Sequence, residues 1–180
     1  MVFSSITFLY LFLPILLISY FIVPRKLRNI ILLSFSILFY FYEERNLLLV
    51  ISCIVNYILG IIIGKNKSKL YLILGIIGNI AILGYYKYSN FFIDNINNLI
   101  GTNITYLKIT LPLGISFFTF QNLSYLVDVY KGEIKPQKNI LNYATYITLF
   151  PQLIAGPIVR YKDVDNELSQ RNESFDNFGN

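Results

Sequence analysis

Six stretches of the sequence contain no charged residue, and most of them are long enough to cross a bilayer as a helix. A helix rises about 1.5 Å per residue, so about 20 residues span the hydrocarbon core. The composition agrees, because 55% of the residues are hydrophobic and only 14% are charged. We therefore expect an all-α polytopic membrane protein, a bundle of transmembrane helices. The stretches are Met1–Pro24, Asn29–Tyr42, Asn46–Gly64, Leu70–Tyr86, Ile109–Val127 and Asn139–Val159.

The first two stretches each admit a second interpretation. Met1–Pro24 resembles a cleaved signal peptide in hydrophobicity, but no basic segment precedes it and no pair of small residues closes it, which favours a retained helix. Asn29–Tyr42 is the shortest stretch. It spans only with snorkelling neighbours or a thinned bilayer, and its length equally suits a re-entrant or buried helix.

Basic residues are distributed unevenly among the connections between these stretches. The first and third connections carry three each, whereas the second has only Arg45 beside two glutamates. Lys and Arg favour the cytoplasmic side, so this alternation predicts an N-terminus outside, Lys87–Lys108 outside and Asp128–Lys138 inside. The net charge of +5 then reflects topology and anionic lipid headgroups, and a nucleic-acid partner is not needed. The basic residues of the two connections are Arg25, Lys26, Arg28, Lys65, Lys67 and Lys69.

The segment from Tyr88 to Gly101 changes from uniformly apolar to amphipathic. Phe92, Ile96 and Leu99 recur at helical spacing, while asparagines fill the other side. This pattern predicts a helix that lies in the outer membrane interface and ends at Gly101. A solvent-exposed loop with a few buried aromatic residues is the alternative.

A polar stripe follows the helix that we expect after Pro112. At about 100° per residue, Gln121, Tyr125 and Asp128 fall within one quadrant. In a membrane helix such a stripe faces the bundle interior or a water-filled path, and an ionisable residue in it is a candidate for function. The alternatives are hydrogen bonds that only fix helix packing and, for Asp128, an ordinary snorkelling anion beside Lys131.

The last apolar stretch contains residues that break helices. Arg160 and Lys162 follow it and prefer the cytoplasm, yet a full crossing would place them outside. Pro151 and the pair Gly156-Pro157 interrupt the helix. We therefore expect Asn139–Val159 to be a broken, re-entrant segment that returns to the inner side.

Two blocks, Leu111–Lys131 and Phe150–Tyr161, and more loosely Gly84–Phe92, resemble the membrane-bound O-acyltransferase (MBOAT) superfamily. The resemblance is to its bacterial branch, typified by the membrane subunit of alginate O-acetyltransferase. It implies an enzyme of the bacterial inner membrane that moves an acyl group, typically acetyl, from a thioester donor to hydroxyls of a cell-envelope or exported polysaccharide. The donor would be acetyl-CoA or an acyl carrier, with no bound cofactor, and the partners would be the lipid bilayer and envelope proteins of the acetylation machinery.

The resemblance also assigns roles to residues of the two blocks. It implies that Gln121, Tyr125 and Asp128 help to shape the inner tunnel wall. Gly156, Pro157 and Arg160 would border the opening through which the donor arrives. Arg160 would bind a donor phosphate, because guanidinium binds phosphate bidentately, or it would simply mark the cytoplasmic edge.

Histidine is absent from the sequence, although the superfamily uses an intramembrane histidine. No other residue is an evident general base near neutral pH, so we expect no catalytic residue in this chain. With a single cysteine, Cys53, a zinc site of the usual ligands is excluded.

We therefore interpret the chain as the N-terminal portion of a longer O-acyltransferase, inactive alone. Its domains would be a membrane region, 1–159, and a truncated cytoplasmic segment, 160–180. The alternatives are a fragment of a transporter or channel, which also uses broken helices, and a non-catalytic scaffold subunit.

Overall fold

The computed structural model describes residues 5–41, 47–155 and 160–164, and all regular secondary structure within them is helical, as predicted. Two continuous helices are long and apolar enough to cross a membrane, Leu47–Asn66 with 20 residues and Lys69–Ile100 with 32. A shorter apolar helix covers Phe8–Ile22. The elements are η1 (Phe8–Phe12), α1 (Leu13–Ile22), η2 (Arg25–Leu27), α2 (Arg28–Phe41), α3 (Leu47–Asn66), α4 (Lys69–Leu83), η3 (Gly84–Tyr88), α5 (Ser89–Ile100), α6 (Ile115–Lys131), α7 (Ile140–Thr148) and α8 (Phe150–Ala155).

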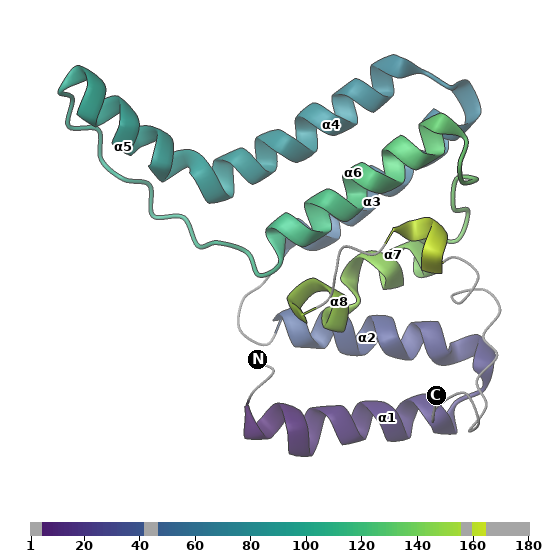
Figure 1. Cartoon of the computed structure of the whole chain (residues 1–180). Coiled ribbons are helices and arrows are strands. Elements are labelled where there is room, and N and C mark those ends of the chain that lie inside the picture. The colour runs from purple at the N-terminus through teal and green to yellow at the C-terminus, as the bar shows by residue number, and fades with distance from the viewer. Residues whose placement is uncertain (1–4, 42–46, 156–159, 165–180) are drawn as a thin grey trace.

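The helices are stacked in layers (Figure 1). The helix α6 packs against α3 and α4, and α7 packs between α2 on one side and α3 and α6 on the other. The pair α1 and α2 forms the lower edge of the view. Aromatic side chains join η1 and α2 to α8, since the Phe39 and Phe150 rings stack at 5.2 Å and Phe12 meets Phe150 edge-on at 5.6 Å.

The basic connections come together at one end of the stack, the right-hand end of Figure 1. The Lys67 ammonium donates to the backbone oxygen of Tyr130 at 3.4 Å, which joins the third connection to the end of α6. The Tyr57 hydroxyl donates to the backbone oxygen of Lys138 at 2.6 Å. Asn29 donates to Asn142 at 2.9 Å, which ties the start of α2 to the same region.

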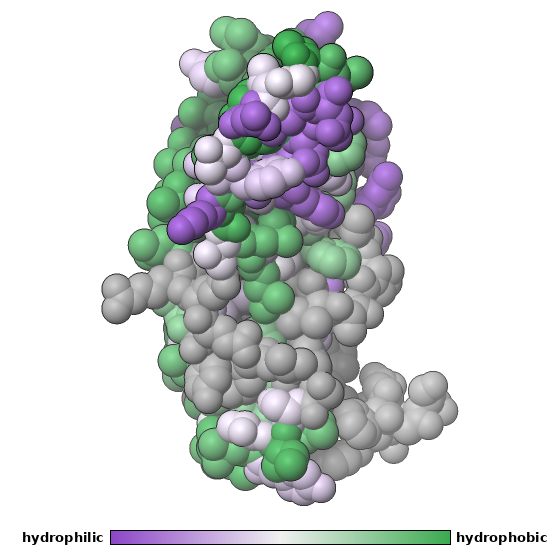
Figure 2. Space-filling view, turned by 90° about the vertical axis from the view of Figure 1, so that its left-hand side faces the viewer, coloured by the Kyte–Doolittle hydropathy of each residue, from purple (hydrophilic) through white to green (hydrophobic). Residues whose placement is uncertain are grey.

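At the opposite end, α5 projects away from the other helices as a continuation of α4 and η3 (Figure 1). The predicted helix end at Gly101 is confirmed, because this residue has φ of +69° and its N–H donates to the Asn97 oxygen. The apolar face of α5 is exposed, with Leu99 84% accessible. Figure 2 views this end and shows hydrophilic side chains gathered over its upper part, with hydrophobic ones along the left flank.

The polar face of α5 is covered by the connection that follows it. The Asn90 side chain donates to the Leu107 oxygen at 3.0 Å and accepts from the Leu107 N–H at 2.9 Å. Asn97 makes the same pair of bonds with Ile104. We call these two pairs of hydrogen bonds the asparagine clamps. Tyr106 donates to Asp94 between them, and this hydrogen bond raises the pKa of Tyr106. The connection therefore lies antiparallel along the helix.

Candidate functional site

The predicted stripe of α6 lies inside the protein. Gln121, Tyr125 and Asp128 are only 2%, 0% and 3% accessible. The helix starts after Gly114, whose φ of +74° provides the turn from the preceding connection, and it ends at Gly132 with φ of +78°. Burial at this level excludes the alternative that Asp128 is an exposed snorkelling anion. A role of these residues in a tunnel stays a prediction.

The three stripe residues differ in how they are bonded. The Tyr125 hydroxyl accepts from the Gln137 N–H at 3.0 Å, and Asp128 accepts a long hydrogen bond of 3.5 Å from the Ser124 hydroxyl. The side-chain oxygen of Gln121 is buried and has no hydrogen-bond partner among the residues that the structure describes. A buried acceptor without a partner costs about 1–3 kcal/mol, so the Gln121 oxygen has bonding capacity that a further donor could use.

Tyr125 forms a cluster with three other tyrosines, Tyr143, Tyr146 and Tyr161. Its ring lies 4.7 Å from that of Tyr143 and 5.3 Å from that of Tyr161, and Tyr161 in turn meets Tyr146 at 5.1 Å. These rings join α6, α7 and the segment 160–164. Sequence reasoning missed Tyr143 and Tyr146. Their spacing of three residues, which places both on one side of α7, was the available signal.

A chain of buried amides and hydroxyls crosses the apolar helices beside the stripe. Asn56 and Asn79 donate to each other, at 3.2 and 2.7 Å, and so join α3 to α4. Asn122 donates to the Ser52 hydroxyl at 3.1 Å and accepts from the Tyr143 hydroxyl at 2.6 Å. The Asn56, Asn79 and Asn122 amides thus bond to neighbouring helices. At these three residues, the polar groups fix the packing of the helices.

In the described part, the last apolar stretch is interrupted at Leu149, ahead of Pro151, and the predicted re-entrant course of Asn139–Val159 stays a prediction. Leu149 has φ of −59° and ψ of 103°, so α7 ends before it and α8 starts at Phe150, just ahead of Pro151. Within the described part of the chain, the side-chain oxygen of Gln152 is buried without a partner, and the same holds for the hydroxyls of Ser36 and Tyr40 on α2.

The donor-entrance candidates are placed only in part. Gly156 and Pro157 lie outside the described residues. Arg160 is exposed, and its backbone oxygen accepts from the Asp163 N–H. Lys162 lies 3.6 Å from the Glu133 carboxylate, which links this segment to the end of α6. The predicted role of Arg160 stays a prediction.

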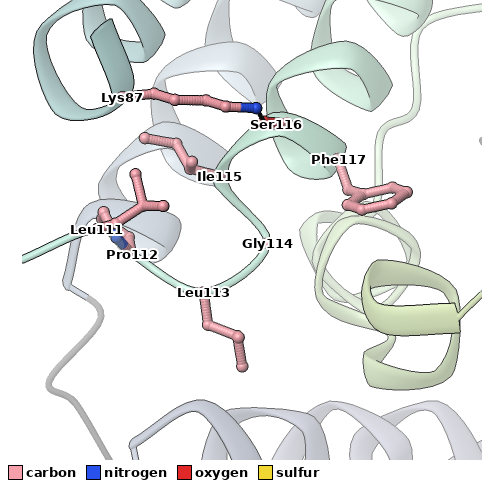
Figure 3. Close-up of a pocket in the computed structure, with 8 residues that line it drawn as sticks. All are labelled: Lys87, Leu111, Pro112, Leu113, Gly114, Ile115, Ser116 and Phe117. Atoms are coloured by element: carbon pink, nitrogen blue, oxygen red, sulfur yellow. Dashed lines mark hydrogen bonds between the residues drawn. The ribbon is translucent and has the colours of Figure 1, made fainter. Parts of the chain in front are cut away.

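A pocket of about 310 Å³ opens where η3 meets the start of α6 (Figure 3). Lys87 reaches across from η3, and its ammonium donates to the Ser116 hydroxyl at 3.0 Å. Sequence reasoning did not single out Lys87. Among the described residues, no group of three or more His, Cys, Asp or Glu is placed to hold a metal ion. The pocket is lined by Lys87, Leu111, Pro112, Leu113, Gly114, Ile115, Ser116 and Phe117.

Comparison with known proteins shows similarity over almost the whole chain. A probable alginate O-acetylase, AlgI, of Pseudomonas aeruginosa is 38% identical over 99% of this chain and 36% of its own length. AlgI of Azotobacter vinelandii is 36% identical over 99% and 38%. A peptidoglycan O-acetyltransferase of Helicobacter pylori is 33% identical over all of this chain and 41% of its own length.

The chain thus spans about two fifths of the length of these curated relatives. No protein-family model matches it. No solved structure matches it either. The similarity nevertheless includes both blocks of α6 and α8 from which the resemblance was drawn, since the matches cover at least 99% of the chain. The chain is therefore related, over almost its whole length, to bacterial O-acetyltransferases of the MBOAT type.

Proposed function

We propose that this chain forms part of a membrane-bound enzyme that transfers an acyl group, acetyl in particular, from a thioester to hydroxyls of a cell-envelope or exported polysaccharide. The observation that carries the proposal is the 31–38% identity to named O-acetyltransferases. In this reaction the hydroxyl oxygen attacks the thioester carbonyl carbon, the C–S bond breaks, and the thiol leaves with the proton. The sequence has no imidazole, so we expect the general base to come from outside these residues.

The proposed enzyme lies in the inner membrane as a multi-pass protein with its N-terminus outside. Support comes from the basic connections that follow α1, α3 and α6, which meet at one end of the stack. Positive charge at one end is the usual mark of the cytoplasmic side. At the other end, the exposed apolar face of α5 suits a helix lying in the outer interface.

The stripe of α6 would face the acyl-transfer path. Gln121 supports this role best, because its buried oxygen accepts no hydrogen bond from the residues that the structure describes and can accept one from a substrate hydroxyl. The break at Leu149 supports a segment that enters the membrane and returns to the inner side. Gly156, Pro157 and Arg160 would then border the entrance for acetyl-CoA or an acyl carrier, with Arg160 near a donor phosphate. The partners would be the lipid bilayer and acetylation proteins of the envelope.

Replacing Gln121 by methionine tests this function in the full-length protein that carries the chain. Methionine keeps the length of the side chain but removes the unpaired oxygen, so folding should be unharmed while acetylation falls about tenfold or more. The measurement is ester formation on an oligosaccharide by purified protein, with thermal unfolding as the control for folding. A normal rate in the variant would remove Gln121 from the path. No ester formed by the unmodified protein would favour a transporter or a scaffold.

A further inference from the structure

We propose that the pocket beside Lys87 binds the headgroup of an anionic phospholipid of the outer leaflet, with the Lys87 ammonium and the Ser116 hydroxyl holding its phosphate. The pocket lies between η3 and the start of α6 (Figure 3). This inference goes beyond acyl transfer, because it depends on the proposed position of the chain in the membrane and on no step of the reaction.

The pair Lys87 and Ser116 presents two neighbouring donors. An ammonium has three N–H bonds, and Lys87 uses one of them on the Ser116 hydroxyl at 3.0 Å. Because Ser116 accepts in this bond, its own O–H remains to donate. Lys87 is exposed and Ser116 is partly buried, so a headgroup can reach both. A phosphodiester has two unesterified oxygens that share one negative charge, and these match two adjacent donors of which one is charged.

The charge of the pocket favours an anionic lipid over a zwitterionic one. Among the described residues that line the pocket, Lys87 alone is charged. A choline or ethanolamine headgroup would bring a second cation close to the ammonium, and the lining offers no carboxylate to receive it. The headgroup of phosphatidylglycerol carries only hydroxyls beyond its phosphate. It therefore pairs one negative charge with the one positive charge of the site.

Aromatic side chains place Lys87 at the depth of lipid headgroups. Tyr85 and Tyr88 belong to the same element, η3, and both are exposed. Exposed tyrosines collect where the membrane meets water, because the ring is apolar and the hydroxyl is polar. The Lys87 ammonium also lies 5.5 Å from the centre of the Tyr88 ring, a cation–π contact that holds it at this level.

The apolar side chains at the pocket suit the rest of the lipid. Small-molecule pockets are mostly apolar with a few placed polar groups, and about 310 Å³ is at the lower end of their range, which fits a headgroup. Leu111 and Leu113 line the pocket and are exposed. Phe120 is exposed one turn after Ser116, on the same face of α6. With the phosphate at Lys87, the acyl chains would run along these exposed side chains.

The end of the stack at which the pocket opens decides the leaflet. The start of α6 lies opposite to the basic connections, on the outer side in the proposed topology. The basic connections would meet phospholipids of the inner leaflet, so the Lys87 pocket is a separate site that a single substitution can remove.

Counting bound lipids tests the proposal. The full-length protein that carries this chain is purified in a neutral detergent and titrated with phosphatidylglycerol or with phosphatidylcholine of the same acyl chains, and native mass spectrometry counts the lipids bound. The variants are Lys87→Gln and the milder Ser116→Ala. The control is Lys108→Gln, which changes an exposed lysine of the connection after α5 that does not line the pocket. Thermal unfolding checks that each variant is folded.

Lys87→Gln should bind one phosphatidylglycerol about tenfold more weakly than the unmodified protein and Lys108→Gln do, because a hydrogen bond to a charged group is stronger than a neutral one. Ser116→Ala should weaken the same lipid less, and it decides the matter alone if Lys87→Gln does not fold. Binding of phosphatidylcholine should be the same in all four proteins.

Equal binding of phosphatidylglycerol by the unmodified protein and the two pocket variants would overturn the proposal. So would an equal loss of phosphatidylcholine, which would mean that the site does not select charge. Displacement of the lipid by glycerol 1-phosphate at the same concentration would also overturn it, since the site would then bind a soluble phosphate ester. Lipid binding is measured without acyl transfer, so an absence of ester formation would overturn the proposed enzyme and leave this site standing.

Discussion

A methyl group added at Gly60 should disrupt the packing of α3 against α6. A Cβ at this position would stand 2.4 Å from Cε1 of Tyr125 and 2.8 Å from its hydroxyl. Carbon atoms in contact prefer about 3.5–4.0 Å, so the ring must move by about 1 Å or more. It has little room, because Tyr125 is fully buried and its ring lies 4.7 Å from that of Tyr143.

The free-energy change of Gly60→Ala can be worked out from these contacts. Overpacking of a buried site costs about 1–3 kcal/mol, and a displaced ring loses the hydrogen bond from Gln137, about 1 kcal/mol. Alanine is favoured over glycine in a helix by about 1 kcal/mol, which offsets part of the loss. The net expectation is destabilisation by about 1–3 kcal/mol.

Thermal unfolding of the detergent-purified protein, followed by circular dichroism at 222 nm, measures this effect. The matched control is Gly78→Ala on α4, where a Cβ meets nothing within 4 Å and only the gain in helix propensity remains. Gly60→Ala should unfold at a lower temperature than the unmodified protein, and Gly78→Ala should not. If both variants unfold alike, the close approach of α3 to Tyr125 is wrong. Combining Gly60→Ala with Tyr125→Leu should restore part of the stability that Gly60→Ala loses, because the smaller leucine side chain leaves space for the added methyl group.

Two further predictions concern buried polar groups, both followed by thermal unfolding. Tyr143→Phe should lower the free energy of unfolding by about 1–3 kcal/mol, because Asn122 loses the 2.6 Å hydrogen bond. Tyr40→Phe should leave the free energy of unfolding unchanged or raise it, since the Tyr40 hydroxyl is buried without a partner among the described residues. Equal losses of stability in the two variants would contradict this difference between the two hydroxyls. Asn79→Leu should cost about 1–3 kcal/mol by leaving Asn56 with fewer partners, and Asn56→Leu together with Asn79→Leu should cost less than the sum of the single changes. Strict additivity would show that the two amides do not interact.

Features encoded locally could be predicted from the sequence. The helical class follows from the charge-free stretches, and the end of α5 follows from Gly101, whose positive φ a side chain would strain. The burial of Gln121 and Asp128 follows from the cost of exposing such groups to lipid. Each of these inferences needs only the helical repeat and the properties of a short segment.

Features that depend on which helices meet could not be predicted. Asn56 and Asn79 are 23 residues apart, and neither apolar stretch contains a sequence signal that predicts their hydrogen bond. The Lys87 pocket needs η3 and the start of α6 to be neighbours, 29 residues apart in the sequence. The asparagine clamps of α5 were missed for a related reason. Asparagines on one side of a helix are expected both when that side faces water and when another part of the protein covers it. The roles of Gln121, Tyr125 and Asp128 in a substrate tunnel remain predictions, as does the role of Arg160 at the donor entrance.

The two asparagine clamps of α5 have a consequence for the length of the connection that they hold. Asn90 and Asn97 are separated by about 10.5 Å of helix, at about 1.5 Å per residue. Leu107 and Ile104 are separated by about 10 Å if the chain between them is extended at about 3.4 Å per residue. The two distances agree, so Asn90 and Asn97 can both form their hydrogen bonds to the connection at the same time. One residue more or fewer between Ile104 and Leu107 would put the second clamp out of reach, and the spacing of the asparagines therefore dictates the length of this strap.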